Sequence, residues 1–165
     1  VVDAKEQVRS GGKIIDLKWI DVNKGDHESP DMRSRLVGRE FREAKDDTLY
    51  AATPPIEAMR SIISDAATVT KGASKGNKEI MVNDVRRAYF YAQTTRCVYV
   101  RLPQEDPEYG AGKLGRLRLC LYGTRDAAKG WQEVLSEHLI ENGFVRGKGF
   151  PSVFTHPERG VRTLV

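Results

Sequence analysis

Asp84 directly follows a short apolar run, and this arrangement constrains the fold more than any other feature of the chain. The run Ile80-Met81-Val82-Asn83 has the composition of a buried strand. A strand over residues 79–84 would bring the Asp84 carboxylate to the edge of a sheet, where it could bind a divalent metal ion. The alternative is that Asp84 only caps the N-terminus of a following helix, a position that favours Asp.

Length and composition are those of a folded globular domain, or of one lobe of a larger domain. The chain has 165 residues, of which 39% are hydrophobic and 30% charged. No apolar stretch approaches the roughly 18 residues of a membrane span, and the N-terminus has no signal-peptide pattern. We therefore expect an intracellular protein without a membrane partner, with cytoplasm and nucleus not distinguished. The first residue is Val, which predicts a segment of a longer product.

The charge and the cysteines narrow the class of protein only slightly. The net charge is +4, and the basic excess falls in residues 81–165. Such an excess is compatible with a polyanionic partner without requiring one. Cys97 and Cys120 lie in apolar stretches without CxxC spacing, so we expect buried, reduced thiols. The three histidines are scattered and form no metal-ligand or triad spacing.

The pattern of apolar residues predicts an α+β fold. In the first half, strands are expected over 13–22 and 33–41, then a helix that Pro54-Pro55 opens, then a polar linker over 71–77. The second half is expected to begin with a strand at 79–84 and a short helix at 85–92, followed by strands at 97–102 and 114–121 around a loop at 103–113. A helix at 124–142 capped by Gly143 and strands at 152–155 and 161–165 are expected to follow. This order resembles a split βαβ layout.

Three arginines are expected on one face of the strand over 33–41. Arg33, Arg35 and Arg39 alternate with other residues, and successive side chains of a strand point to opposite sides. Guanidinium groups in such a row suit a triphosphate or a nucleic-acid backbone. A solvated face of an edge strand is the alternative.

Two further features are open to a structural or a functional interpretation. Tyr89 could pack in a core, as aromatic residues do by default, or contact a ligand. Tyr122-Gly123 joins a strand to a helix, and Gly would let a ligand approach the backbone closely, although an ordinary turn would also use it. Trp131, on the long helix, is expected in the core.

Six segments resemble, in the right order, motifs of the reverse transcriptase of Ty1/copia-type retrotransposons, over about residues 15–165. The family's K-A-R-L-V-A-R-G-F resembles residues 33–41, T-F-A-P-V…S-I-R resembles 50–63, L-D-V-K-T-A-F-L-N-G resembles 83–92, V-Y-M-x-Q-P resembles 98–103, L-Y-G-L-K-Q-A-P-R-A-W resembles 121–131, and G-F…P-S-L-F resembles 143–154.

The resemblance implies the fingers and partial palm of a right-hand polymerase. Residues 1–78 would form a fingers-like segment and 79–165 a partial palm with a ferredoxin-like split βαβ layout, with a fingers insertion near 97–121. The implied activity is RNA-directed DNA polymerisation within a retroelement polyprotein. Its partners would be an RNA template, a DNA primer, deoxynucleoside triphosphates and the remainder of the polyprotein.

The resemblance also implies roles for single residues. Asp84 matches the first metal-binding aspartate of the palm, and its carboxylate with the Val85 carbonyl would hold Mg²⁺, or alternatively Mn²⁺, in a two-metal site. Tyr89 matches the steric gate, whose ring rejects a ribose 2′-hydroxyl. The remaining implied contacts are nucleotide binding by Arg33, Arg35, Tyr122 and Gly123, and nucleic-acid binding by Arg39 and Arg125.

The chain also departs from the family pattern. The family continues after a strand like 162–165 into a Tyr/His-x-Asp-Asp turn that supplies two more carboxylates. Because the chain stops at Val165, we expect this segment alone not to polymerise. Asp126, Ala128 and Phe150 stand where the family has Gln, Pro and Asp, which indicates a divergent copy. The alternatives are a non-catalytic nucleic-acid-binding remnant of such an element and a generic α+β domain.

Overall fold

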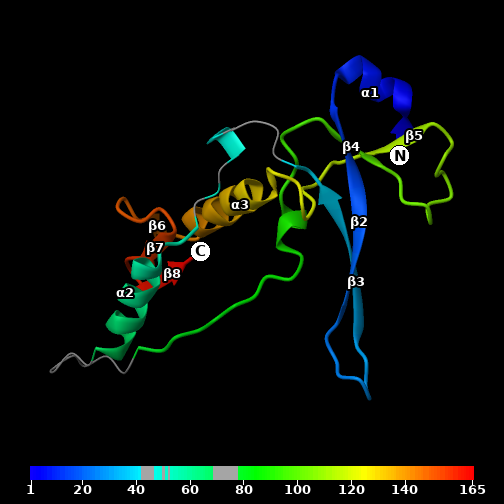
Figure 1. The fold of residues 1–165 in the computed structure, drawn as a ribbon. Helices are drawn as coiled ribbons and strands as arrows, with labels where there is room; N and C mark the ends of the chain where they lie inside the picture. Colours follow the sequence, from blue (N-terminus) through cyan, green and yellow to red (C-terminus); the bar gives the residue numbers. More distant parts are fainter. Residues whose placement is uncertain (42–46, 50, 52, 69–77) are drawn as a thin grey trace. The chain divides into compact units, whose positions relative to one another are not determined.

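The computed structural model describes residues 1–41, 47–49, 51, 53–68 and 78–165 (Figure 1). The chain forms two compact units. The first contains residues 1–50 and 87–131, and the second contains 51–86 and 132–165. Each unit thus combines parts of both halves of the sequence, and the division into fingers and palm remains a prediction about the family's fold.

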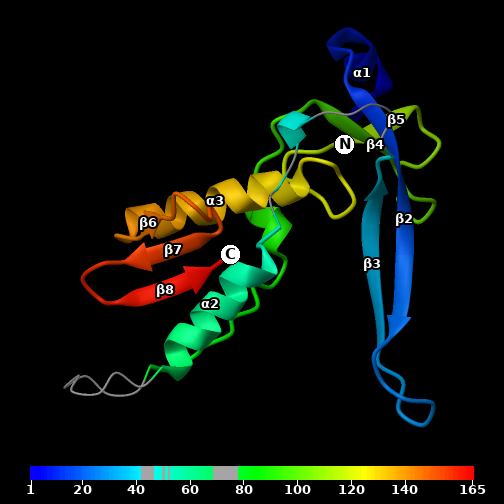
Figure 2. The same cartoon turned by 60° about the vertical axis from the view of Figure 1, so that its left-hand side comes forward.

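A five-stranded sheet organises the first unit. Its strands, in spatial order, are β1 (Val2–Asp3), β5 (Lys113–Arg116), β4 (Val98–Arg101), β2 (Lys13–Asn23) and β3 (Met32–Arg39). The start of β2 pairs in parallel with β4, and the remainder of β2 pairs antiparallel with β3. Figures 1 and 2 show β2 and β3 side by side as a two-stranded ribbon. Both strands predicted for the first half are therefore confirmed.

The core of the first unit lies where β2 meets β4. Ile15, Val98 and Val100 are buried together, with Leu17 and Leu117 packed against them. These residues are apolar and mostly β-branched, which suits a pleated surface buried on one face. The helices of the unit are α1 (Ala4–Ser10), η1 (Asp47–Leu49), η2 (Ala88–Tyr91) and the start of α3 (Ala127–Glu141).

The second unit combines a helix with a three-stranded sheet. Its elements are α2 (Ile56–Ala67), the end of α3, and the strands β6 (Val145–Arg146), β7 (Val153–His156) and β8 (Val161–Leu164), paired in the order β6-β7-β8. Helix α2 packs against β8 (Figure 2). Its Asp65 pairs with Arg162 of that strand at 3.3 Å. The predicted helix after Pro54-Pro55 and the last two predicted strands are confirmed, and these strands pair with each other.

The predicted C-terminal cap of the long helix is also confirmed. Gly143 has a φ of 85°, the left-handed conformation that Gly adopts at little cost. Its N–H donates to the Ile140 carbonyl, and the Phe144 N–H donates to the Leu139 carbonyl, both at 3.0 Å. These bonds satisfy carbonyl groups that the end of a helix would otherwise leave without partners.

The predicted strand over residues 79–84 is wrong. Residues 78–85 have no regular secondary structure, and Ile80, Met81 and Val82 are 57%, 79% and 91% exposed. A strand needs a neighbouring strand to satisfy its backbone groups, and none of the described segments pairs with this one. Asp84 therefore lies in an exposed, extended segment.

Three other predictions need adjustment. The strand over 114–121 ends as β5 at Arg116, and beyond it only single contacts continue, such as the bridge between Leu119 and Gln93. The helix over 85–92 is a short 3-10 turn, and Cys97 is only half-buried. The linker over 71–77 lies outside the described residues.

The α+β class is confirmed, whereas the split βαβ layout does not appear among the strands that the structure describes. Strands β4 and β5 pair within the sheet of β2 and β3, while β6, β7 and β8 form a sheet of their own. None of the described helices has the length and apolarity that crossing a bilayer requires.

Candidate functional site

The arginine-bearing face of β3 has the predicted arrangement. The antiparallel register places Arg33, Arg35 and Arg39 opposite Val22, Ile20 and Asp16 of β2. Directly opposed residues of an antiparallel pair share a face of the sheet, so the three guanidinium groups lie on one side of the ribbon. All three arginines are exposed. Arg33 pairs with Asp31 at 3.0 Å, and Arg39 lies over the Phe41 ring at 5.5 Å.

The end of β3 is joined to the turn that contains Tyr122 and Gly123. The Gly38 N–H donates to the Tyr122 carbonyl at 2.7 Å, and the Glu40 N–H donates to the Gly123 carbonyl at 3.3 Å. Gly123 has a φ of 85°, and a Cβ at this position would overlap the carbonyl oxygen of Gly38. Only glycine permits both this conformation and this approach. We call this contact between residues 38–40 and 122–123 the glycine joint.

Aromatic rings gather around Tyr122. Its ring centroid lies 4.6 Å from that of Tyr89 and 5.9 Å from that of Phe90. Tyr89 and Phe90 belong to the 3-10 turn η2, which follows directly after Arg87 in the left-handed conformation with a φ of 57°. Tyr89 is half-buried and Phe90 is 38% exposed. Tyr89, Tyr122 and Gly123, for which the resemblance implies nucleotide binding, therefore lie together in the first unit.

A network of charges that the sequence analysis missed surrounds the glycine joint. Two nitrogens of Arg96 donate to the two carboxylate oxygens of Glu40 at 2.7 and 2.8 Å, and one of them also donates to Asp126 at 2.8 Å. The Glu40 side chain is fully buried and also accepts the backbone N–H of Arg125 at 2.8 Å. Thr94 donates to the second Asp126 oxygen at 2.9 Å.

These contacts keep both carboxylates ionised. Burial raises the pKa of Glu40, but hydrogen bonds from Arg96 and from the Arg125 N–H, together with the charges of Arg96 and Lys13, outweigh it and lower the pKa below 4.5. Burial acts in the same way on Asp126, where hydrogen bonds from Arg96 and Thr94 prevail and lower the pKa below 3.8. The acidic partners correspondingly raise the pKa of Arg96. Glu40, Arg96 and Asp126 are far apart in the sequence, and nothing in their spacing predicted that their side chains meet.

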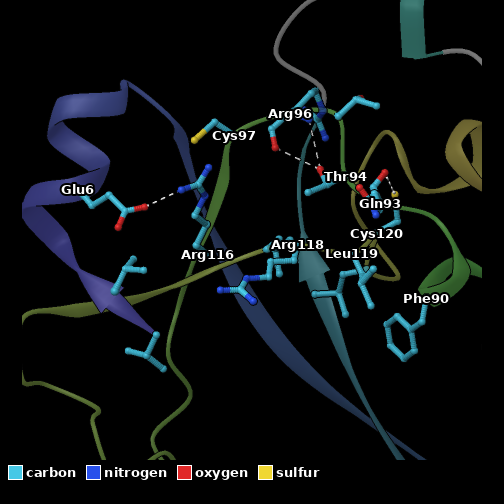
Figure 3. Close-up of a pocket in the computed structure, with 15 residues that line it drawn as sticks. Glu6, Phe90, Gln93, Thr94, Arg96, Cys97, Arg116, Arg118, Leu119 and Cys120 are labelled. Carbon is cyan, nitrogen blue, oxygen red and sulfur yellow. Dashed lines mark hydrogen bonds and ion pairs between the residues drawn. The ribbon is translucent and has the colours of Figure 1, made fainter.

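An open groove lies beside this network in the first unit (Figure 3). Arg116 and Arg118 line it, together with Phe90 and Leu119. Arg116 reaches Glu6 at 2.9 Å, so its charge is already paired. Cys97 also faces the groove, and hydrogen bonds with Ser10 and Tyr99 lower the pKa of its thiol. The charged side chains that line the groove are those of Glu6, Arg96, Arg116 and Arg118, of which Arg96 and Arg116 are paired with carboxylates.

Asp84 and Val85 belong to the second unit, whereas the aromatic residues and the β3 arginines belong to the first. Both residues are exposed, so the carboxylate of Asp84 is open to solvent rather than covered by packed side chains. Among the described residues, no group of three His, Cys, Asp or Glu side chains could hold a metal ion. A carboxylate and a backbone carbonyl are the oxygen ligands that Mg²⁺ prefers, so these two residues could provide part of a coordination shell.

Comparison with known proteins identifies the class to which this fold and these motifs belong. A model of the family described as reverse transcriptase (RNA-dependent DNA polymerase) matches residues 4–164. The chain therefore belongs to the reverse transcriptase family. No solved structure matches it significantly.

The relatives among curated proteins place the chain with the Ty1/copia branch. The Ty1-BL and Ty1-DR4 transposon Gag-Pol polyproteins of Saccharomyces cerevisiae (strain ATCC 204508 / S288c) are each 32% identical over 88 residues, which cover 52% of this chain and 5% of each relative. The TyH3 Gag-Pol polyprotein of Saccharomyces cerevisiae matches with the same identity and coverage. The chain is thus a reverse transcriptase segment of Ty1/copia type, and the aligned part spans about a twentieth of these relatives.

Proposed function

We propose that the β3 arginines, Tyr89, Tyr122 and Gly123 bind the incoming deoxynucleoside triphosphate, and that Asp84 contributes a metal ligand. They would do so in an RNA-directed DNA polymerase that copies an RNA template from a DNA primer. The observation that carries the proposal is the glycine joint. It connects the arginine-bearing strand β3 to the ring of Tyr122, against which Tyr89 packs. Cations for a triphosphate and aromatic faces for a nucleoside thereby belong to one compact unit, as a nucleotide site requires.

In this proposal the residues around the glycine joint have separate roles. Arg33 and Arg35 bind phosphate oxygens through their exposed guanidinium groups. Gly123 contributes to nucleotide binding by holding the Tyr122 turn against β3, because a side chain there would fill the space that the Gly38 carbonyl occupies. Tyr89 lies under the sugar and excludes a 2′-hydroxyl group. Arg39 and Arg125 contact the phosphates of the nucleic-acid strands.

Asp84 is the proposed catalytic residue. Its carboxylate and the Val85 carbonyl would hold Mg²⁺, or alternatively Mn²⁺, together with carboxylates from outside the described residues. When bound, a pair of such ions neutralises the triphosphate and activates the primer hydroxyl group.

Primer extension tests this proposal. A protein that carries these 165 residues followed by the Asp-Asp turn and remaining palm of a copia-type reverse transcriptase is compared with its Asp84→Asn and Asp21→Asn variants on an RNA template with Mg²⁺. We expect Asp84→Asn to abolish extension and leave template binding intact, and Asp21→Asn to change neither. Extension by Asp84→Asn would remove Asp84 from catalysis.

A non-catalytic, nucleic-acid-binding role is the second candidate. The exposed arginine face of β3 favours it, because that face needs no metal ion to bind phosphates. Template binding without any extension by the parent protein, under conditions where an unaltered copia-type enzyme extends, would select this candidate.

A further inference from the structure

Arg96 links three segments of the first unit that are distant in the sequence. Its guanidinium group binds Glu40, at the end of β3, and Asp126, at the start of α3, while Arg96 itself lies just before β4. Glu40 stands where the family motif over residues 33–41 has Gly, and Asp126 stands where the motif over residues 121–131 has Gln. Both acids thus replace an uncharged residue. Two separate departures from the pattern therefore meet on a single side chain.

The position of this cluster relates it directly to the glycine joint. Glu40 donates its own N–H to the Gly123 carbonyl, and its carboxylate accepts the N–H of Arg125, so it is bonded to both sides of Thr124. Asp126 lies directly after Arg125. The cluster of Arg96, Glu40 and Asp126 consequently fastens the turn that carries Tyr122 at Gly123 and Arg125, beyond the bond from Gly38.

The free-energy cost of burying charge makes Arg96 the critical residue of this cluster. Without it, the carboxylates of Glu40 and Asp126, with side chains 0% and 6% exposed, would lose the cation that they share, and Glu40 would keep an ion pair with Lys13 at 3.8 Å. Buried carboxylates without their partner are strongly unfavourable. The turn would then have to move away from β3 to let water reach the acids.

We infer that Arg96 is a positioning residue that holds the Tyr122–Gly123 turn against β3 and thereby sets the affinity for the nucleotide without touching it. The effect on nucleotide affinity rests on the proposed function. The effect on the contact between the turn and β3 can be measured separately. Lys in place of Arg96 keeps the positive charge and loses the planar fork that binds two carboxylates at once.

The test uses the 165-residue chain with Arg96→Lys and, as a matched control, Arg116→Lys. Arg116 also pairs with a carboxylate, that of Glu6 in α1, which belongs to neither β3 nor the turn. Amide hydrogen exchange at Gly38 and Glu40 reports the joint, and equilibrium binding of thymidine triphosphate with Mg²⁺ reports the site. For Arg96→Lys we expect exchange about tenfold faster and binding about tenfold weaker, the effect of losing one charged hydrogen bond. Arg116→Lys should change neither.

Each outcome decides the inference. Unchanged exchange and affinity in Arg96→Lys overturn it, as does an equal loss in Arg116→Lys, because a general loss of stability would then be responsible. If the unaltered chain does not bind the nucleotide, the proposed function fails, and the exchange rates alone decide whether Arg96 holds the joint. Arg96→Gln should exceed the effect of Arg96→Lys, and if it fails to fold, Arg96→Lys still provides the comparison.

Discussion

Gly38 and Gly123 lie in direct backbone contact, although they come from a strand and a turn that are far apart in the sequence. The Gly38 N–H donates to the carbonyl that precedes Gly123, and a Cβ on Gly123 would overlap the Gly38 carbonyl oxygen. This contact fixes the distance between the arginine-bearing strand and the aromatic residues. It is therefore the part of the candidate site that should tolerate substitution least.

Gly123→Ala should destabilise the first unit strongly. The substitution combines the left-handed conformation, which costs about 1–2 kcal/mol for a residue with a Cβ, with overlap against backbone, which typically costs about 1–3 kcal/mol more. Gly110→Ala is the matched control, because Gly110 has a φ of 77° and nothing within 4 Å of an added Cβ. Urea denaturation should give a clearly larger loss for Gly123→Ala. Equal losses would mean that the close approach to Gly38 does not contribute.

The cluster of Arg96, Glu40 and Asp126 predicts a loss of stability in acid. The pKa values of Glu40 and Asp126 are lower in the folded chain than their ordinary values of 4.5 and 3.8. Groups of this kind contribute stability above their unfolded pKa and lose it as the pH falls through the folded value. The free energy of unfolding should therefore decrease as the pH falls below about 4.5, the ordinary value for Glu40.

Asp126→Asn isolates this contribution. Its free energy of unfolding should depend less steeply on pH in that acidic range than the free energy of the parent chain, because one depressed carboxylate is gone. Asp31→Asn removes an exposed carboxylate that pairs with Arg33 on the surface, and its pH dependence should match that of the parent. Identical slopes for all three proteins would contradict the assignment of acid sensitivity to the cluster.

The sequence predicted local structure well where one segment carried its own signal. The residues of β3 alternate, so its arginine face could be assigned before the structure, and the cap at Gly143 followed from a glycine after a long helical stripe. The clustering of Tyr89 with Tyr122 was reached only through the resemblance to a family, because their spacing alone does not bring them together. The Arg96 cluster was missed, since ion pairs between distant segments depend on how those segments fold back.

Residues 79–84 show where prediction from a single segment fails. An apolar run predicts burial, but it does not name the strand that would provide its hydrogen bonds, and the described residues contain none. Val82→Ala should therefore cost less than about 0.5 kcal/mol, as expected for an exposed position. Val98→Ala, at a position only 1% exposed, should cost considerably more because it leaves a cavity. A comparable cost at both positions, measured by urea denaturation, would show that residues 79–84 are packed in solution.

The β3 arginines should contribute electrostatic binding energy to nucleic acid. Arg35→Ala should weaken binding of single-stranded RNA and reduce the slope of log affinity against log salt by about 0.7, the value for one phosphate contact to a single strand. Arg159→Ala, which removes the same charge from the turn between β7 and β8, should leave that slope unchanged. Equal effects would attribute binding to the net charge of +4 rather than to the arginine face.

Tyr89 should discriminate between deoxyribose and ribose if it acts as the proposed steric gate. Its ring packs at 4.6 Å from that of Tyr122, so Val in its place leaves room where the sugar would lie. We expect Tyr89→Val to raise the incorporation of ATP relative to dATP by roughly tenfold or more, because a missing steric clash of this size is worth at least about 1.4 kcal/mol. Tyr91→Val is the control, since Tyr91 belongs to the same 3-10 turn but is 64% exposed and lies 6.0 Å from Trp131 instead. An unchanged ratio in Tyr89→Val would leave Tyr89 as a packing residue for Tyr122, whereas a change shared with Tyr91→Val would point to a general loosening of η2.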